Sequence, residues 1–151
     1  MKKIISLLFV IPTLLACSDN TYKGAKIKLE YVEEGALLEV EAKHMFDEAF
    51  TNKVDSIYLI ADDSCKACQS LKTYLTFWCK DNHANVYEIV YSKVDEESLN
   101  YIIDSTVGYY AWTKESTVPT TYFFMQGVVA MTGDNETTGK LLDKYVEVVK
   151  S

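Results

Sequence analysis

The feature that most constrains this chain is a pair of cysteines, Cys65 and Cys68, placed directly after an apolar run. Residues 57–61 are apolar throughout, which is typical of a strand buried on both faces of a sheet. From about residue 66 to residue 80 the apolar side chains recur at helical spacing. The two cysteines therefore lie where a buried strand gives way to a helix, with both thiols on its first turn.

A thiol at the start of a helix is well placed to ionise. The unpaired backbone N–H groups and the positive end of the helix dipole both stabilise a thiolate there. In motifs of this spacing the pKa of a cysteine falls from about 8.5 to roughly 3.5–7.5. We expect Cys65 to be the exposed nucleophile and Cys68 to resolve a mixed disulfide. Lys66 should favour the thiolate, whereas Asp62 and Asp63 should oppose it.

Metal and haem sites are alternative uses of such a pair. A zinc site needs four ligands, and the sequence has no second pair of closely spaced cysteines. His44 and His83 are isolated and are expected at the surface or in a satisfied core. Haem attachment needs a histidine directly after the second cysteine, where Gln69 stands. No metal and no cofactor is therefore expected, and a permanent structural disulfide stays open as the alternative.

A further cysteine, Cys79, follows Cys68 by 11 residues on the same predicted helix. Eleven residues span roughly 16 Å along a helix axis, whereas a disulfide joins Cα atoms within about 7 Å. The two residues therefore cannot pair. Cys79 is expected to be a small buried apolar residue, with an accessory thiol or an intermolecular bridge as the alternative.

The first 17 residues have the pattern of an export signal that ends in an attachment point. Two lysines precede an apolar run over residues 4–15, which is shorter than the roughly 20 residues of a membrane span. The run leads into Leu-Leu-Ala-Cys17, which resembles the lipobox of bacterial lipoproteins. That resemblance implies cleavage before Cys17 and acylation of this residue, hence a lipid anchor on the extracytoplasmic side of the bacterial cell envelope. An ordinary signal peptide with a chance cysteine is the alternative.

The expected organisation is a signal peptide over residues 1–16, a lipidated cysteine with its tether over residues 17–25, and one domain over residues 26–151. The formal net charge is −7, and all 15 basic residues are lysines. A chain of this charge, without arginine to clamp phosphates, is not expected to bind nucleic acid. Its contact with a membrane is expected to depend on the lipid anchor.

The remaining periodicities predict an alternation of strands and helices. Strands are expected at residues 27–31, 37–40 and 85–91 and in a hairpin over 121–125 and 128–131, and helices at 42–52, 96–107 and 136–150. Such an alternation, with a hairpin near its end, predicts an α/β fold whose mixed central sheet has helices on both faces.

Two segments resemble the thioredoxin superfamily, namely residues 57–68 and residues 117–133. In that family a cis-proline precedes the hairpin and faces the cysteine pair, and a glycine forms the turn. Pro119, Phe124 and Gly127 match this arrangement, and a cis peptide bond is nearly confined to proline. The resemblance covers roughly residues 40–150 and implies a thioredoxin-like fold.

The cysteine pair, Pro119 and the export signal together predict an activity, namely thiol–disulfide exchange on exported proteins with a redox partner protein. The resemblance also implies a place for the client. Val118 and Pro119 would then lie against Cys65 and present their backbone to an extended client peptide.

Three aromatic residues, Tyr109, Tyr110 and Trp112, precede this proline in a predicted loop. They are expected to pack against the domain, and a place at the border of the client groove is the alternative.

The chain departs from the thioredoxins proper at several positions. Ser64 stands where they carry tryptophan, and Lys66-Ala67 where they carry Gly-Pro. Leu59 takes the place of the aspartate that they bury six residues before the first cysteine, so the proton of the resolving thiol needs another acceptor. These departures favour a specialised extracytoplasmic relative. They also leave open a non-catalytic binding or chaperone lipoprotein, or an accessory factor for one secreted client.

Overall fold

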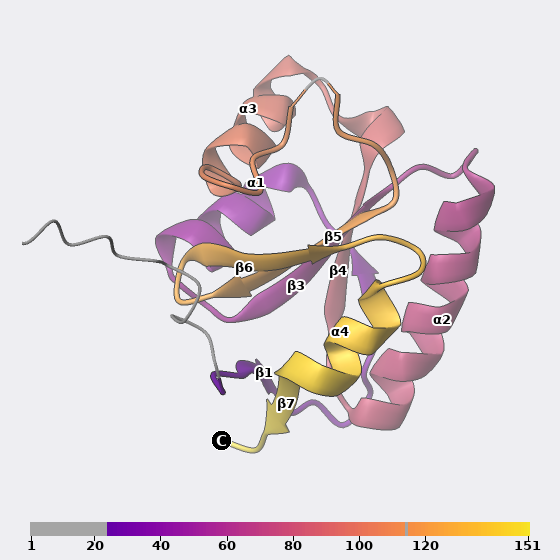
Figure 1. The fold of residues 1–151 in the computed structure, drawn as a ribbon, viewed down its shortest axis with the longest axis vertical. Coiled ribbons are helices and arrows are strands. Elements are labelled where there is room, and N and C mark those ends of the chain that lie inside the picture. Colours follow the sequence, from indigo (N-terminus) through magenta and orange to yellow (C-terminus); the bar gives the residue numbers. More distant parts are fainter. Residues whose placement is uncertain (1–23, 114) are drawn as a thin grey trace, which may run out of the picture.

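The structure, a computed structural model, describes residues 24–113 and 115–151, so the predicted signal peptide and Cys17 lie outside the described residues. Its elements, in chain order, are β1 (Ile27–Glu30), β2 (Leu37–Glu39), α1 (Ala42–His44) continued by a π-helical segment (Met45–Thr51), β3 (Ser56–Ala61), α2 (Lys66–Asn82), β4 (Val86–Val90), a short 3-10 helix (Tyr91–Lys93), α3 (Glu96–Ser105), β5 (Thr120–Met125), β6 (Val128–Gly133), α4 (Thr138–Tyr145) and β7 (Val146–Val149). Figure 1 shows their arrangement.

The main sheet has five strands in the order β2-β4-β3-β5-β6. The first three of these strands run parallel, whereas β5 is antiparallel to β3 and β6 is antiparallel to β5. The turn between β5 and β6 has positive φ at both Gln126 and Gly127, as expected for a tight hairpin with the twist of its strands. The predicted mixed sheet and its hairpin are confirmed.

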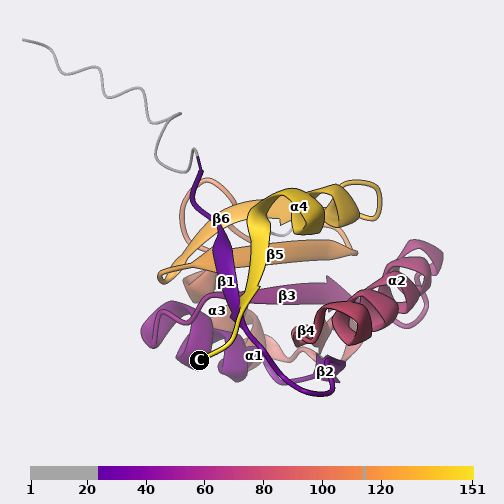
Figure 2. The same cartoon turned by 90° about the horizontal axis from the view of Figure 1, so that it is seen from below.

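The central strand β3 is buried along its whole length because apolar layers cover both faces of the sheet (Figure 2). On one face Ile57, Leu59 and Ala61 of β3 meet Leu71 and Leu75 of α2 in one apolar cluster. Residues of β1, β4, β5 and α4 also belong to this cluster. The stripe predicted for the helix after the cysteine pair is thus the contact between α2 and the sheet.

The opposite face of the sheet carries α1, its π-helical continuation and α3. Tyr58 and Ile60 of β3 point to this side and belong to a second cluster with Met45 and Ile102. The alternation along β3 therefore places successive side chains in two different cores. Helices on both faces of a mixed sheet confirm the predicted α/β class.

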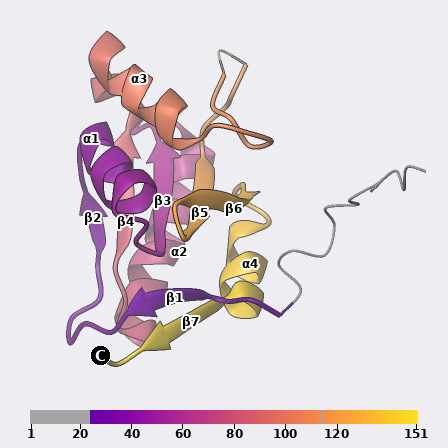
Figure 3. The ribbon, with the colours of Figure 1, turned by 90° about the vertical axis from the view of Figure 1, so that its left-hand side faces the viewer.

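The C-terminal segment corrects one prediction. A helix was expected over residues 136–150, but α4 ends at Tyr145 and the four residues after it form β7, which pairs in parallel with β1. Val146, Val148 and Val149 are β-branched, and such residues lose side-chain freedom in a helix and fit a strand. The β1–β7 pair lies across one end of the main sheet (Figure 3), where Ile27 and Leu29 of β1 are buried.

The turn between β1 and β2 contains a glycine that the packing requires. A Cβ at Gly35 would lie 1.9 Å from the carbonyl oxygen of Cys79 and 2.7 Å from the backbone of Ala84. The chain thus passes directly against the end of α2 at this point, which no larger residue permits without displacement of backbone.

Among the described residues, no helix is long and apolar enough to cross a membrane.

Candidate active site

Cys65 and Cys68 lie at the junction of β3 and α2, as the sequence predicts. Cys65 is the residue that caps the start of α2, and Cys68 lies one turn into the helix. Their Cα atoms are 5.1 Å apart and the two sulfurs form a disulfide. Cys65 is half-buried, whereas Cys68 is fully buried in the apolar cluster beneath α2. Only the first of the two sulfurs is thus open to a large reactant.

The helix supplies a hydrogen bond to the more accessible sulfur. The backbone N–H of Cys68 donates to Sγ of Cys65 at 3.1 Å, so the sulfur occupies the place of a side-chain cap. When the disulfide is reduced, the same N–H group and the positive end of the helix favour a thiolate at this position. A leaving group or nucleophile at Cys65 is therefore stabilised by the backbone itself.

The segment that leads into β5 reaches the same sulfur. Sγ of Cys65 lies 3.8 Å from the carbonyl oxygen of Val118, although the two residues are 53 positions apart in the sequence. The peptide bond between Val118 and Pro119 is cis. The structure thus brings together the cysteine pair and the two residues that the sequence suggested for contact with a client peptide.

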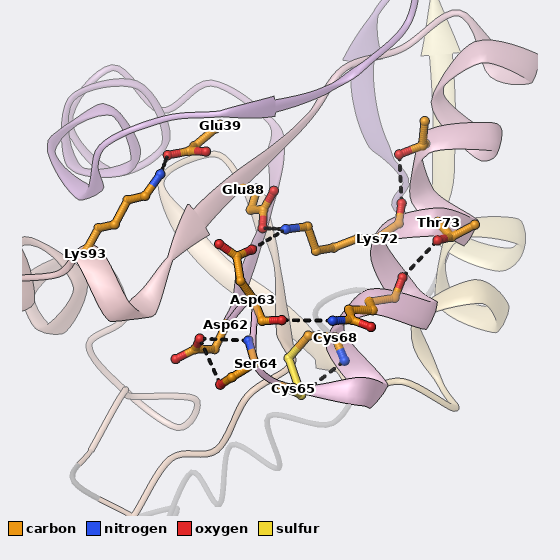
Figure 4. Close-up of polar contacts among 12 residues, drawn as sticks. Glu39, Asp62, Asp63, Ser64, Cys65, Cys68, Lys72, Thr73, Glu88 and Lys93 are labelled. Atoms are coloured by element: carbon orange, nitrogen blue, oxygen red, sulfur yellow. Dashed lines mark hydrogen bonds and ion pairs between the residues drawn. A yellow bond between two sulfur atoms is a disulfide. The ribbon is translucent and has the colours of Figure 1, made fainter.

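The two aspartates ahead of the pair have local partners that occupy their carboxylates (Figure 4). Oδ1 of Asp62 accepts from the backbone N–H and the hydroxyl of Ser64, both at 3.2 Å. Oδ1 of Asp63 accepts from Nζ of Lys72 at 3.0 Å, and this hydrogen bond lowers the pKa of Asp63. The negative charges of Asp62 and Asp63 are expected to disfavour a thiolate at Cys65. Their hydrogen-bond partners, above all the ammonium of Lys72, weaken this effect.

Sequence reasoning missed one charged residue near the pair, Glu88 in β4. It is 6 % exposed and is the one charged residue buried within the described part of the chain. Its register partner in β3 is Leu59, the residue that stands where thioredoxins bury an aspartate. The signal was a single glutamate within an otherwise apolar strand, Val86-Tyr87-Glu88-Ile89-Val90.

The aromatic residues before the proline divide between two environments. Trp112 is 4 % exposed and packs near Tyr91 and Tyr122, as expected of a core residue. Tyr109 is 95 % exposed and contacts Tyr110 edge to face. Packing thus accounts for Trp112 and leaves Tyr109 in the solvent at the tip of the loop.

The remaining candidate residues lie away from the disulfide. Cys79 is a free, buried thiol, as the sequence predicts. Nδ1 of His44 lies 2.9 Å from the hydroxyl of Tyr58, and Nδ1 of His83 lies 2.9 Å from the carbonyl oxygen of Glu33. Both histidines thus have partners within the fold.

Comparison with known proteins agrees with this architecture at the level of the fold. No protein-family model matches the sequence, and no curated protein is significantly similar to it in sequence. Among solved structures, thioredoxin O1 of Arabidopsis thaliana in its oxidised state is similar with a TM-score of 0.56 at 14 % identity, over 74 % of this chain and 99 % of that one. A thioredoxin of Nicotiana alata is similar with a TM-score of 0.52 at 11 % identity, over 76 % and 96 % of the two chains.

A variant thioredoxin from Halobacterium salinarum is similar at a TM-score of 0.51 and 18 % identity, over 79 % of this chain and 96 % of that one. These likenesses, together with the mixed sheet and its flanking helices, show that the chain has a thioredoxin-like fold. In this fold the Cys65–Cys68 pair stands at the start of the helix that follows the central strand.

Proposed function

We propose that this protein is a thiol–disulfide oxidoreductase that acts on exported proteins through the Cys65–Cys68 pair. The observation that carries the proposal is the position of the Cys65 sulfur. It caps α2, accepts a hydrogen bond from the N–H of Cys68 and lies 3.8 Å from the carbonyl oxygen of Val118. An accessible sulfur with a helix start on one side and peptide backbone on the other is suited to exchange with a cysteine in an extended segment.

In the reducing direction the exchange has two steps. The thiolate of Cys65 attacks one sulfur of a client disulfide, the client S–S bond breaks, and the second client sulfur leaves as a thiolate that takes a proton from solvent. Cys68 then loses its proton and attacks Sγ of Cys65, which forms the Cys65–Cys68 disulfide. The first client sulfur is released as a thiolate and takes up a proton, so the proton that Cys68 gave up is balanced. Two electrons pass to the client, and a redox partner protein returns them to the pair. The oxidising direction is the reverse of these steps.

The proposed place of action is the extracytoplasmic face of a bacterial membrane. The support is the sequence of the first 17 residues, with its basic start, apolar run and Leu-Leu-Ala-Cys17 ending. Export would place the pair where disulfides persist, and acylation of Cys17 with two or more chains would hold it at the membrane. Mass spectrometry of the mature N-terminus tests this part of the proposal, which an unmodified Cys17 or another cleavage site would overturn.

The activity is tested with a disulfide substrate such as insulin. Cys65→Ser is expected to abolish turnover with the fold intact, and Cys68→Ala is expected to trap the client as a stable mixed disulfide on Cys65. Cys79→Ala is the matched control, because this thiol is buried away from the site, and it should retain turnover.

Turnover by the Cys65→Ser variant would contradict the proposal. So would a wild-type pair that exchanges with no substrate and has a reduction potential below about −300 mV, the range of structural disulfides. That second result would instead favour a binding or chaperone protein that keeps the fold.

A further inference from the structure

Glu88 is a buried charge in the apolar layer beneath α2, and such a charge is costly unless it is paired. Its register partner in β3 is Leu59, which belongs to the same apolar cluster as Cys68. Because register partners in neighbouring parallel strands point to the same face, the carboxylate points toward α2. The ion pair of Glu88 with Lys72 of α2 agrees with this direction.

Lys72 is the ionic partner of this carboxylate. Nζ of Lys72 lies 2.6 Å from Oε1 of Glu88 and 3.0 Å from Oδ1 of Asp63. Oε1 of Glu88 is buried, and apart from this ion pair it has no polar partner within the described residues. Burial lowers the pKa of Lys72, but its two carboxylate partners raise it above the ordinary value, so the ammonium stays charged. Because each carboxylate oxygen can accept more than one hydrogen bond, Glu88 can still accept a proton beside its ion pair with Lys72.

The ion pair of Glu88 with Lys72 and the buried sulfur of Cys68 lie on the same face of the sheet, beneath α2. Cys68 and Lys72 are four residues apart on α2, so their side chains lie one above the other on the same face of the helix. In Figure 4 the side chains of Cys68 and Lys72 leave α2 on the same side, and Glu88 lies on that side. Cys68 is fully buried, so bulk water has no direct access to its sulfur. The proton of this thiol therefore needs an acceptor inside the protein.

We propose that Glu88 accepts the proton that Cys68 releases when it resolves a mixed disulfide. The inference rests on the proposed exchange activity and extends it to the resolving step. The S–H bond of Cys68 breaks and its proton passes to the carboxylate of Glu88, while the sulfur attacks Sγ of Cys65. The bond between Cys65 and the client sulfur breaks, and the client leaves as a thiolate that is protonated by solvent. Glu88 later returns its proton to solvent, which leaves the overall exchange balanced.

The other charges around Glu88 are unsuited to this role. Lys72 cannot accept a proton while it is charged, because its nitrogen has no free electron pair. Asp63 is exposed, and the hydrogen bond from Lys72 lowers its pKa, which makes it a weaker proton acceptor. Lys93, just after β4, pairs with Glu39 of β2, which is the register partner of Glu88 on its other side. The β3 neighbour is the apolar Leu59. Glu88 is thus the carboxylate of this group that is buried in the layer of Cys68.

The resolving step can be measured directly in the full chain. Reduced protein is mixed with excess oxidised glutathione, quenched with acid and analysed by mass spectrometry for the mixed disulfide. Glu88→Gln is expected to accumulate this species and to slow its resolution at pH 7 on the order of 10²-fold, the contribution of a positioned general base. The deficit should shrink as the pH rises toward and beyond a thiol pKa of about 8.5, because Cys68 then ionises without help.

The control is Glu39→Gln, an exposed glutamate in register on the next strand. This variant is expected to resolve the mixed disulfide at the wild-type rate. A wild-type rate for Glu88→Gln, or a deficit that is the same at every pH, would overturn the proposal, because the latter pattern indicates a purely structural effect.

A second measurement uses the wild-type protein and does not depend on turnover of a substrate. Carbon-13 NMR of the wild-type protein follows the Glu88 carboxyl and the Cys68 Cβ across pH in both redox states. Coupled sites titrate together, so the Glu88 signal of the reduced protein is expected to show a step at the pH where Cys68 ionises, absent when the disulfide is formed. Identical Glu88 titrations in the two states would overturn the proposal, whereas inactivity toward insulin or glutathione with this step present would count against the proposed function alone.

Discussion

Cys79 lies near the end of α2, fully buried in the cluster that joins this helix to the sheet. Burial raises the pKa of its thiol from the ordinary 9.0 to about 11, partly offset by a hydrogen bond with the backbone of Val86. The thiolate is the reactive form of cysteine. At neutral pH Cys79 therefore stays protonated and acts as a small apolar residue.

This raised pKa predicts a pH dependence of stability. A group whose pKa is higher in the folded state contributes stability below its unfolded pKa, and loses it as the pH rises through the folded value. For Cys79 the loss falls between pH 9.0 and about 11. The difference in unfolding free energy between the wild type and Cys79→Ala, measured in urea, is expected to shrink by about 2 kcal/mol over this range. A constant difference would contradict it.

Residue positions also show how far the sequence alone could lead. The spacing of Cys65 and Cys68 after a buried run located the pair, because local spacing and helix geometry fix that motif. The role of Glu88 could not be predicted in the same way. The sequence shows that a charged residue interrupts an apolar strand, but it does not show toward which face of the sheet that residue points. That face depends on the pairing of β4 with β3, a contact between strands distant in the sequence.

At the scale of elements, β7 stabilises the fold by covering β1. The two strands pair from Ile27 with Val146 to Glu30 with Val149, and the backbone N–H of Tyr31 donates to the carbonyl oxygen of Val149 at 2.9 Å. Ile27 and Leu29 are 1 % and 3 % exposed in this arrangement. Without β7, β1 would lose the strand with which it pairs.

A chain that ends at Tyr145 is therefore expected to be less stable. Burial of an isoleucine or leucine side chain is worth about 1.5–3 kcal/mol, so the loss is expected to be about 3 kcal/mol or more in urea unfolding. A chain that ends at Val149 is the control, because it lacks only the exposed Lys150 and Ser151. Equal midpoints for the two truncated chains would show that β7 is dispensable.

The same element explains the error in the predicted last helix. Apolar residues at Leu141, Leu142, Tyr145 and Val149 fit helical spacing, but short apolar runs do not distinguish helix from strand. The deciding contact is with β1, more than a hundred residues earlier in the chain. The hairpin of β5 and β6, by contrast, was predicted correctly because its turn residues are local.

At the scale of the whole molecule, the described chain begins and ends at the same end of the domain. Figure 1 shows β1 and the C-terminus at the bottom, whereas α2 starts at the upper right. The loop that carries Tyr109 ends at Val118, which contacts Cys65. An anchor joined ahead of β1 would therefore leave the cysteine pair directed away from its attachment surface.

This geometry makes a prediction about surface-bound protein. A chain attached through a histidine tag ahead of residue 24 to vesicles with nickel-chelating lipids is expected to reduce insulin at nearly the rate of the free chain. A tag inserted after Gly108, in the exposed loop at the other end, is expected to lower the rate on binding to the same vesicles. An equal loss of activity in both arrangements would contradict the orientation.

The parallel pairing of β1 with β7 also sets the order in which the domain can be completed. Strand β1 lacks the strand with which it pairs until β7 has left the ribosome. Until then Ile27 and Leu29, which the pair keeps buried, stay uncovered, and such exposed apolar surface favours aggregation. A nascent chain of this protein therefore completes this part of its core only after residues 146–149 have emerged, and a chaperone could bind the uncovered strand until then.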